Sequence, residues 1–327
     1  MEGLPFEKVI VDSRTASSGN GTSFEVTLPE TLHLPANAVC YVTDLAVSHS
    51  FYTVEGVTSI GSKNHYLYFL ERTYNSGDFT ILNRTTLVSQ SYAPEELAAE
   101  LQSKMNAVSI FSASAYTVVY NAQKNAFTLT LNYTHPDPLH VTYPGFFVIN
   151  QDLLGDQGFQ TYVASRQLEG GHDGQRQNLA QYMINFRDPQ DCLGLLGFSK
   201  GASGNTQWPE LEAKLAGSPP SLPTSQATQA VDVRHRHVLY LHSNALSNLR
   251  VIGPAGSRSV IARIPVTSLF GGLVTRAHSG HPLDCVPCGS RTLRTLDFQL
   301  KDSFAQLVDL HGGHISFELL FAQKPLL

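Results

Sequence analysis

Alternation of apolar and polar residues with a period of two recurs along most of this 327-residue chain. In one early segment Phe24, Val26 and Leu28 alternate with polar residues, and Pro29 ends the run. Further apolar positions with this spacing are Tyr41, Leu45 and Val47; Tyr116, Val118 and Tyr120; Phe127, Leu129 and Leu131; Leu239 and Leu241; Val260, Ala262, Ile264 and Val266; Leu296, Phe298 and Leu300; and Ile315, Phe317, Leu319 and Phe321. A period of two is typical of strands with one buried face, so these segments predict a chain built mainly of β-strands.

Helical periodicity is confined to one segment. Pro94 suits the first position of a helix, and the two glutamates that follow complement the positive end of its dipole. Apolar residues then recur every four positions, at Leu97, Leu101 and Met105. We expect this helix to end at Asn106. One helix among many strands predicts a mainly β, mostly antiparallel fold, because parallel pairs need crossover connections that are usually helical.

Composition narrows the class of protein. Hydrophobic residues make up 42% and charged residues only 15% of the chain, with a net charge of −5. This balance argues against disorder, against a coiled coil and against a basic surface for direct nucleic-acid binding. No apolar run reaches the roughly 18 residues that a membrane span requires. The first residues lack the basic start and apolar stretch of a secretory signal, so we expect a soluble protein made inside the cell.

Loop-rich composition divides the chain. Residues 1–20 are poorly patterned and predict an N-terminal arm. A turn-forming stretch follows at Glu169–Gly174, and a region rich in Pro, Ser and Gly extends from Gly201 to Gln229. The latter has the composition of an exposed loop and contains Trp208, the only tryptophan, whose role the sequence leaves open between an interface anchor and a loop plug. We expect a β-sandwich that carries an insertion with one helix, a β-hairpin and this loop.

The familiar catalytic motifs are absent from the sequence. It contains no Gly-x-x-x-x-Gly-Lys phosphate loop, no Gly-x-Gly-x-x-Gly after a strand and no Gly-x-Ser-x-Gly nucleophile turn. The four cysteines are too few for a disulfide scaffold, and Cys40 and Cys192 lie in apolar surroundings that predict buried thiols. We therefore expect no enzyme activity, no catalytic residues and no cofactor.

Two histidine-containing segments could hold a metal. On a strand, His235 and His237 would project from one face, as paired ligands do in cupin-type β-barrels. The carboxylate that the cupin pattern requires a few residues later is missing, and the alternative that we favour is a polar strand edge. In the second segment His278, His281, Cys285 and Cys288 have zinc-binding chemistry, but their spacing is tight. A loop of free thiols, or an oxidised Cys285–Cys288 pair, is equally consistent, so we assign no metal-binding residue.

Several stretches resemble a known family. The C-terminal segment from Leu293 to Phe321 has a strand, an Asp-containing turn, an Asp-Leu-x-Gly step and a final strand with Ser-Phe. This resembles the closing hairpin of single jelly-roll minor capsid proteins, the penton proteins of adenovirus-like viruses, Polintons, adintoviruses and virophages. Four stretches upstream of this segment occur in the same order as in that family: Ser23–Pro29, Tyr92–Asn106, Tyr116–Leu131 and Cys192–Phe198.

The resemblance implies a single jelly-roll β-sandwich formed by residues 21–73 and 230–327, with the insertion at residues 74–229. It also implies a structural protein of the virion capsid that forms homopentamers at the five-fold vertices of an icosahedral shell. The expected partners are other copies of this chain and a neighbouring major capsid protein of the double jelly-roll, hexon-like type. The sequence has no Arg-Gly-Asp, the integrin-binding triplet of many adenovirus pentons.

Two other functions stay open at this point. A cupin-like metal-binding enzyme would use His235 and His237. A carbohydrate-binding sandwich for host attachment would use exposed aromatic side chains, which the sequence does not distinguish from buried ones.

Overall fold

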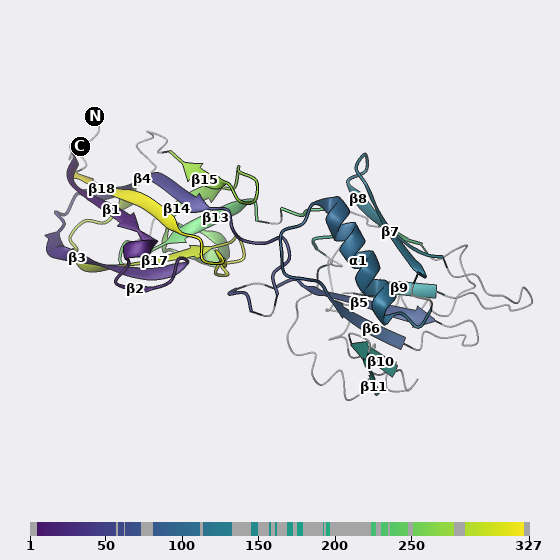
Figure 1. The fold of residues 1–327 in the computed structure, drawn as a ribbon. Coiled ribbons are helices and arrows are strands. Elements are labelled where there is room, and N and C mark those ends of the chain that lie inside the picture. Colours follow the sequence, from purple (N-terminus) through teal and green to yellow (C-terminus); the bar gives the residue numbers. More distant parts are fainter. Residues whose placement is uncertain are drawn as a thin grey trace, which may run out of the picture. The chain divides into compact units, whose positions relative to one another are not determined.

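The computed structural model describes two compact units. The residues described are 5–56, 58–61, 63–72, 81–111, 114–132, 145–149, 157, 161, 169–172, 175–178, 192, 194–196, 224–226, 230–234, 236–247, 251–277 and 285–323. The first unit comprises Met1–Tyr52, Ser59–Ser62 and Arg236–Leu327, and the second comprises Thr53–Thr58 and Lys63–His235. Each unit has its own sheets and its own core (Figure 1).

The first unit consists of two antiparallel sheets that face each other. One sheet has the order β1-β18-β4-β15, with the short β16 also paired to β4. Its strands are β1 (Pro5–Asp12), β4 (Ala38–Ser48), β15 (Leu273–Arg276), β16 (Val286–Pro287) and β18 (Ile315–Gln323). We call it the β4 sheet, after its longest strand.

The second sheet of this unit has the order β14-β13-β17-β3-β2. Its strands are β2 (Ser18–Gly19), β3 (Ser23–His33), β13 (Val238–His242), β14 (Val260–Pro265) and β17 (Thr292–Lys301). Short 3-10 helices lie at η1 (Ser13–Thr15) and η2 (Pro254–Gly256). Leaving aside β2 and β16, the eight remaining strands pass from one sheet to the other at each step except between β13 and β14, which pair in one sheet. This is the strand order of a jelly roll, so the predicted fold class is confirmed. We call this the jelly-roll unit.

The jelly-roll core follows from the period-two pattern. On β18 the inward residues Ile315, Phe317, Leu319 and Phe321 are buried. The Phe298 ring of β17 lies between those of Phe24, 5.4 Å away, and Phe317, 5.0 Å away at an interplanar angle of 80°. Aromatic rings from both sheets therefore fill the space between them, as expected for a sandwich with a packed interior.

The connections of the jelly-roll unit gather at two ends. At one end the β1–β3, β14–β15 and β17–β18 connections meet, and the chain leaves after Tyr52 and returns at Arg236. At the other end Leu34 donates its N–H to the carbonyl of Arg291. There Pro5 also pairs with Ala322, so the N- and C-terminal strands reach the same end (Figure 1). We call the two the insertion end and the terminal end.

The structure differs from the expected N-terminal arm over residues 1–20. Residues 5–12 instead form β1, which pairs antiparallel with β18 from Pro5 to Asp12. Its Val11 is buried in the core, whereas Ile10 points outward and is 72% exposed. Three consecutive apolar residues, Val9, Ile10 and Val11, hide the alternation, so the sequence pattern does not show this edge strand.

The second unit, the insertion unit, contains two sheets and one helix. One sheet has the order β11-β10-β6-β5-β9, in which β10 and β6 are parallel, and the other has the order β12-β8-β7. Their strands are β5 (Tyr66–Arg72), β6 (Ile81–Thr86), β7 (Tyr116–Asn121), β8 (Ala126–Leu131), β9 (Gly145–Ile149), β10 (Glu169–His172), β11 (Gln175–Asn178) and β12 (Thr224–Gln226). The β7–β8 hairpin confirms the one expected from Tyr116 to Leu131.

The helix α1 (Pro94–Val108) confirms the predicted helix but extends two residues beyond Asn106. The side chain of Asn106 does not close the helix. It pairs with the backbone of Tyr116, donating to the carbonyl at 3.0 Å and accepting from the N–H at 2.7 Å. Val108 continues the buried face of α1, which packs against β6 and β7.

The boundary of the insertion also differs from the expectation. Residues 53–58, 63–73 and 230–235 belong to the insertion unit rather than to the jelly roll. Strand β5 is buried on both faces: Leu67 and Phe69 belong to the core of this unit, and Tyr68 and Leu70 on the opposite face are buried as well. Burial on both faces is the same signal that a sandwich strand would give, so it does not reveal to which unit a strand belongs.

The two cores share no residue. Arg236 donates from Nη1 to the carbonyl oxygen of Tyr52 at 3.3 Å, so the two points where the chain leaves and re-enters the jelly roll are close together.

We therefore expect the jelly-roll unit to fold when residues 53–235 are replaced by a flexible linker of about six residues. Near-UV circular dichroism and hydrogen exchange of β17 and β18 would test this. Loss of exchange protection in these strands would contradict the independence of the two cores.

Candidate assembly surface at the insertion end

The β17–β18 connection, residues 302–314, is held in a defined shape by two aspartates. The carboxylate of Asp302 accepts the N–H groups of Phe304 at 2.8 Å and Gln306 at 3.0 Å. Ala305 is left-handed, with φ at 61°. The turn thereby holds Phe304 at its tip, where the side chain is 75% exposed.

The second half of this connection contains the Asp-Leu-His-Gly step. Asp309 accepts the N–H of His311 on Oδ1 at 2.8 Å, and Gly313 donates to the carbonyl of Leu310 at 2.7 Å. The chain reverses here through left-handed His311 and Gly312, with φ of 45° and 82°. Glycine suits the second position because it adopts a positive φ without a Cβ penalty.

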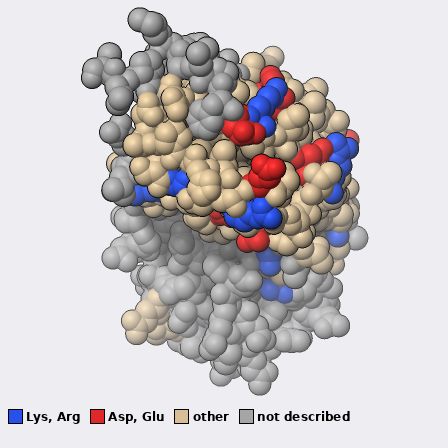
Figure 2. Space-filling view, turned by 90° about the vertical axis from the view of Figure 1, so that its left-hand side faces the viewer, with Lys and Arg blue, Asp and Glu red and all other residues tan. Residues whose placement is uncertain are grey.

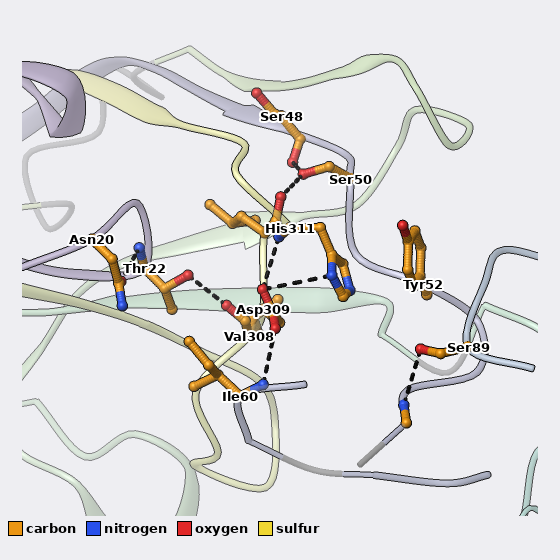
Figure 3. A network of polar contacts seen from close by, with 12 residues as sticks. Asn20, Thr22, Ser48, Ser50, Tyr52, Ile60, Ser89, Val308, Asp309 and His311 are labelled. Atoms are coloured by element: carbon orange, nitrogen blue, oxygen red, sulfur yellow. Dashed lines mark hydrogen bonds and ion pairs between the residues drawn. The ribbon is translucent and has the colours of Figure 1, made fainter. Parts of the chain in front are cut away.

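Three other segments are fastened to this connection (Figure 3). Thr22, from the β1–β3 connection, donates to the carbonyl of Val308 at 2.8 Å, and Ser50 donates to that of Leu310. The N–H of Ile60 donates to Asp309 Oδ2 at 2.9 Å. Segments far apart in the sequence are therefore fixed by backbone and carboxylate groups of one turn.

Close packing of backbones accompanies these bonds. A Cβ on Gly21 would clash with the carbonyl oxygen of Gly313, and a Cβ on Gly313 would clash with Ser50 Oγ. Both positions therefore exclude larger residues.

A series of aromatic rings covers the insertion end beside this turn. His49 stacks on Phe51 at 4.2 Å, and Tyr52 stacks on His311 at 3.8 Å with an interplanar angle of 17°. Phe270 lies 5.8 Å from Tyr52. His49 donates from Nδ1 to the carbonyl oxygen of Ser268 at 2.9 Å, an acceptor that requires the proton on Nδ1.

Large apolar side chains remain exposed at this end of the unit. They are Leu269, Phe270 and Leu273 at the β14–β15 connection, and Phe304 at the tip of the β17–β18 connection. Exposed apolar groups held on rigid turns are the kind of anchor that protein interfaces use, because little entropy is lost when they bind. The insertion end therefore has the features of a docking surface.

Ion pairs also lie elsewhere on the jelly-roll unit. On the outer face of the β4 sheet Lys8 lies 2.7 Å from Glu318 and lowers the pKa of that carboxyl. Arg14 lowers the pKa of Asp12 in the same way, through hydrogen bonds to its carboxylate. On the face shown in Figure 2, acidic and basic side chains are intermingled on one side, and the described residues beside them carry few charges.

Of the four histidines that could form a metal site, the structure describes His237. His237 is exposed and lies before β13, not on a strand as expected, and its carbonyl accepts the N–H of Val266 at 2.9 Å. His235, His278, His281 and Trp208 lie outside the described residues. Within the described part of the chain, no group of three or more His, Cys, Asp or Glu side chains is arranged to hold a metal ion.

The four cysteines are free thiols. Cys40 and Cys192 are buried, which confirms the expectation for both. Cys288 is buried as well, and burial raises the pKa of its thiol to about 12. Such a thiol stays protonated and unreactive at neutral pH.

The sequence indicated only part of this surface. The Asp-Leu-x-Gly step pointed to residues 309–312, but nothing marked Ser50 and Ile60, whose partners are about 250 residues away. Gly21 and Gly313 were the one local signal of close backbone packing, but the chain contains 25 glycines, so a glycine alone does not mark such a site.

No protein-family model matches the sequence, and no curated protein matches it. Among solved structures, the chain is similar over 98% of its length to the penton protein of mavirus. That similarity covers all of the mavirus chain, with 8% sequence identity and a TM-score of 0.43. It is also similar over 99% of its length to a chain of the Sputnik virophage, with 98% of that chain covered, 10% identity and a TM-score of 0.41.

Proposed function

We propose that this protein is a structural protein of a viral capsid, a penton that forms homopentamers and closes the five-fold vertices of an icosahedral shell. The observation that carries the proposal is the strand order of the two sheets, which is that of a single jelly roll. The sequence resemblance to penton proteins over residues 293–321 supports it, because this segment forms β17, the Asp-rich turn and β18. In this role the protein resides in the virion, contacts the major capsid protein and has no catalytic residues.

The physical requirements of a five-fold ring fit the jelly-roll unit. A ring needs heterologous contacts, in which one patch of a subunit meets a different patch of the next. The rigid turns with exposed apolar side chains at the insertion end and the largely uncharged area of Figure 2 are two such patches. Low charge suits extended contacts, since charged groups are costly to desolvate at the centre of an interface.

The other functions that use jelly rolls are less well supported. Cupins hold a metal inside the barrel, whereas here the rings of Phe24, Phe298 and Phe317 pack between the sheets. His237 is exposed, so it does not lie between the sheets, where a cupin metal ligand would have to be. In the part of the chain that the structure describes, no helix has the length and apolar character of a membrane span.

The solution mass of the purified chain tests the proposal. We expect light scattering at several concentrations to give about five times 35.7 kDa, with five-fold rings in negative-stain images. If the chain is monomeric alone, co-expression with the major capsid protein becomes the deciding experiment, because some shell proteins assemble only with their neighbours. A chain that stays monomeric and also stays out of those shells would contradict the proposal. Binding of the monomer on a glycan array would then favour host attachment.

A further inference from the structure

The chain returns to the jelly-roll unit for four residues in the middle of its passage to the insertion unit. Ser59–Ser62 belong to the jelly-roll unit, whereas Thr53–Thr58 before them and the residues from Lys63 onward belong to the insertion unit. This returning segment is separated from Tyr52, the last residue before the chain leaves, by only six residues. A simple linker between two units would not need such a return.

Specific contacts hold the returning segment. Ile60 donates its N–H to Asp309 Oδ2 at 2.9 Å, and Gly61 forms an antiparallel β-bridge with Val308. Ser59 is 6% exposed, whereas Ile60 is 39% exposed, so the segment is held at the surface through its backbone and through Ser59. A hydrogen bond to a carboxylate is stronger than one between neutral groups, which makes Asp309 the principal attachment point.

Gly61 is the residue that permits this close approach. Its φ is 90°, in the left-handed region, and a Cβ at this position would clash with the carbonyl oxygen of Leu307. Both the backbone angle and the available space therefore require glycine.

The same turn also holds the residue at which the chain leaves the jelly roll. The second oxygen of Asp309 accepts the N–H of His311, and the His311 ring stacks on Tyr52 (Figure 3). One carboxylate, that of Asp309, therefore binds both Ile60 of the returning segment and His311. The His311 ring in turn packs on Tyr52, where the chain leaves the jelly-roll unit.

We propose that Ser59–Ser62 act as a latch, a second attachment that couples the insertion to the β17–β18 turn. This inference does not depend on the capsid role. Because the latch is tethered close to Tyr52, its effective concentration at the turn is high, on the order of millimolar, and a few contacts suffice to close it. The same small number of contacts lets it open, so that displacement of the insertion changes residues 308–313, the second half of the β17–β18 connection.

Hydrogen exchange of the full-length chain tests the latch. In Asp309→Ala the N–H of Ile60 loses its acceptor, and we expect the peptide containing residues 59–61 to exchange at least tenfold faster. Strand β17, which lies in the core, should exchange at the wild-type rate. Asp309→Asn keeps an oxygen acceptor at the same place and should retain most of the protection.

Coupling in the opposite direction is tested by blocking the latch itself. Gly61→Val prevents docking, and we expect the turn at residues 308–313 to exchange faster although none of its residues is changed, because coupling is reciprocal. Ser59→Ala is the matched control: its hydroxyl is buried without a hydrogen-bond partner among the described residues, so its removal should leave exchange unchanged. Wild-type exchange of the turn in Gly61→Val, or of residues 59–61 in Asp309→Ala, would overturn the proposal.

Discussion

Replacement of Glu71 by alanine is expected to lower the free energy of unfolding of the insertion unit by about 3–5 kcal/mol. The carboxylate is fully buried and accepts four hydrogen bonds. The donors are Asn83 Nδ2 at 2.6 Å, Ser109 Oγ at 2.6 Å, Tyr116 Oη at 2.8 Å and the N–H of Ile110 at 3.1 Å. Without the carboxylate, four donors from β6, β7 and the end of α1 lose their common acceptor in a region closed to water. Urea unfolding followed by hydrogen exchange in α1 would measure the loss.

Two further variants separate the causes. Tyr116→Phe removes a single donor and should cost only about 1 kcal/mol, since the three others still satisfy the carboxylate. Glu71→Gln keeps the shape but lacks an ionisable proton. A loss in Glu71→Ala no greater than that in Tyr116→Phe would show that the carboxylate does not organise this region.

The pH dependence of Glu71 is opposite to that of an exposed ion pair. Burial raises its pKa above the ordinary value of 4.5, and the hydrogen bonds, that from Ser109 first, offset part of the rise. The folded unit therefore holds the proton more tightly than the unfolded chain does. Its contribution is largest below pH 4.5 and falls as the pH rises through the raised pKa, above which it is constant. The difference in free energy of unfolding between wild type and Glu71→Gln, measured as a function of pH, should therefore fall as the pH rises above 4.5 and then level off. The other acidic groups are the same in both proteins, so their contributions cancel in this difference.

Replacement of Phe298 by alanine is expected to destabilise the jelly-roll unit by about 3–5 kcal/mol. Its ring is fully buried between Phe24 and Phe317, so truncation removes apolar burial, leaves a cavity and breaks two ring contacts. Because the cores are separate, the hydrogen exchange of α1 in the insertion unit should stay unchanged.

Ile10→Ala is the matched control for Phe298→Ala. Ile10 is also an apolar residue on a jelly-roll strand, but it is 72% exposed and should change the stability by less than about 0.5 kcal/mol. If Phe298→Ala shifted the unfolding of both units equally, the molecule would unfold as one cooperative structure and the separation of the cores would have no energetic meaning.

The sequence predicted the regular parts of the jelly roll because period two reports directly on strands with one buried face. Strand β18 shows this well: Ile315, Phe317 and Leu319 face the core while Ser316 and Glu318 do not. The helix was predicted for the same reason, from the spacing of Leu97, Leu101 and Met105. Local periodicity therefore carried the fold class.

The remaining features depend on contacts between distant residues. Glu71 is the penultimate residue of β5, and as a charged residue near the end of a strand it would be placed at the surface. It is buried because donors 12 to 45 residues away converge on it. Asp309 and Ile60 are likewise separated by 249 residues. Strand β1 was missed because Ile10 is an apolar residue on an outward face, where a polar one is usual. Sequence patterns do not encode such pairings. The latch and most of the candidate docking surface therefore came from the structure, and only the Asp-Leu-x-Gly step was visible in the sequence.

The pairing of Pro5 with Ala322 means that the jelly-roll chain is nearly a closed loop. If the N- and C-termini were joined by a short linker, every strand pair would stay in place. The chain could then be cut at the insertion end, where it leaves or re-enters the jelly-roll unit. A circularly permuted protein whose sequence begins at Arg236 and ends at His235 would contain the same two sheets, with the insertion unit now as a C-terminal appendage attached through Tyr52.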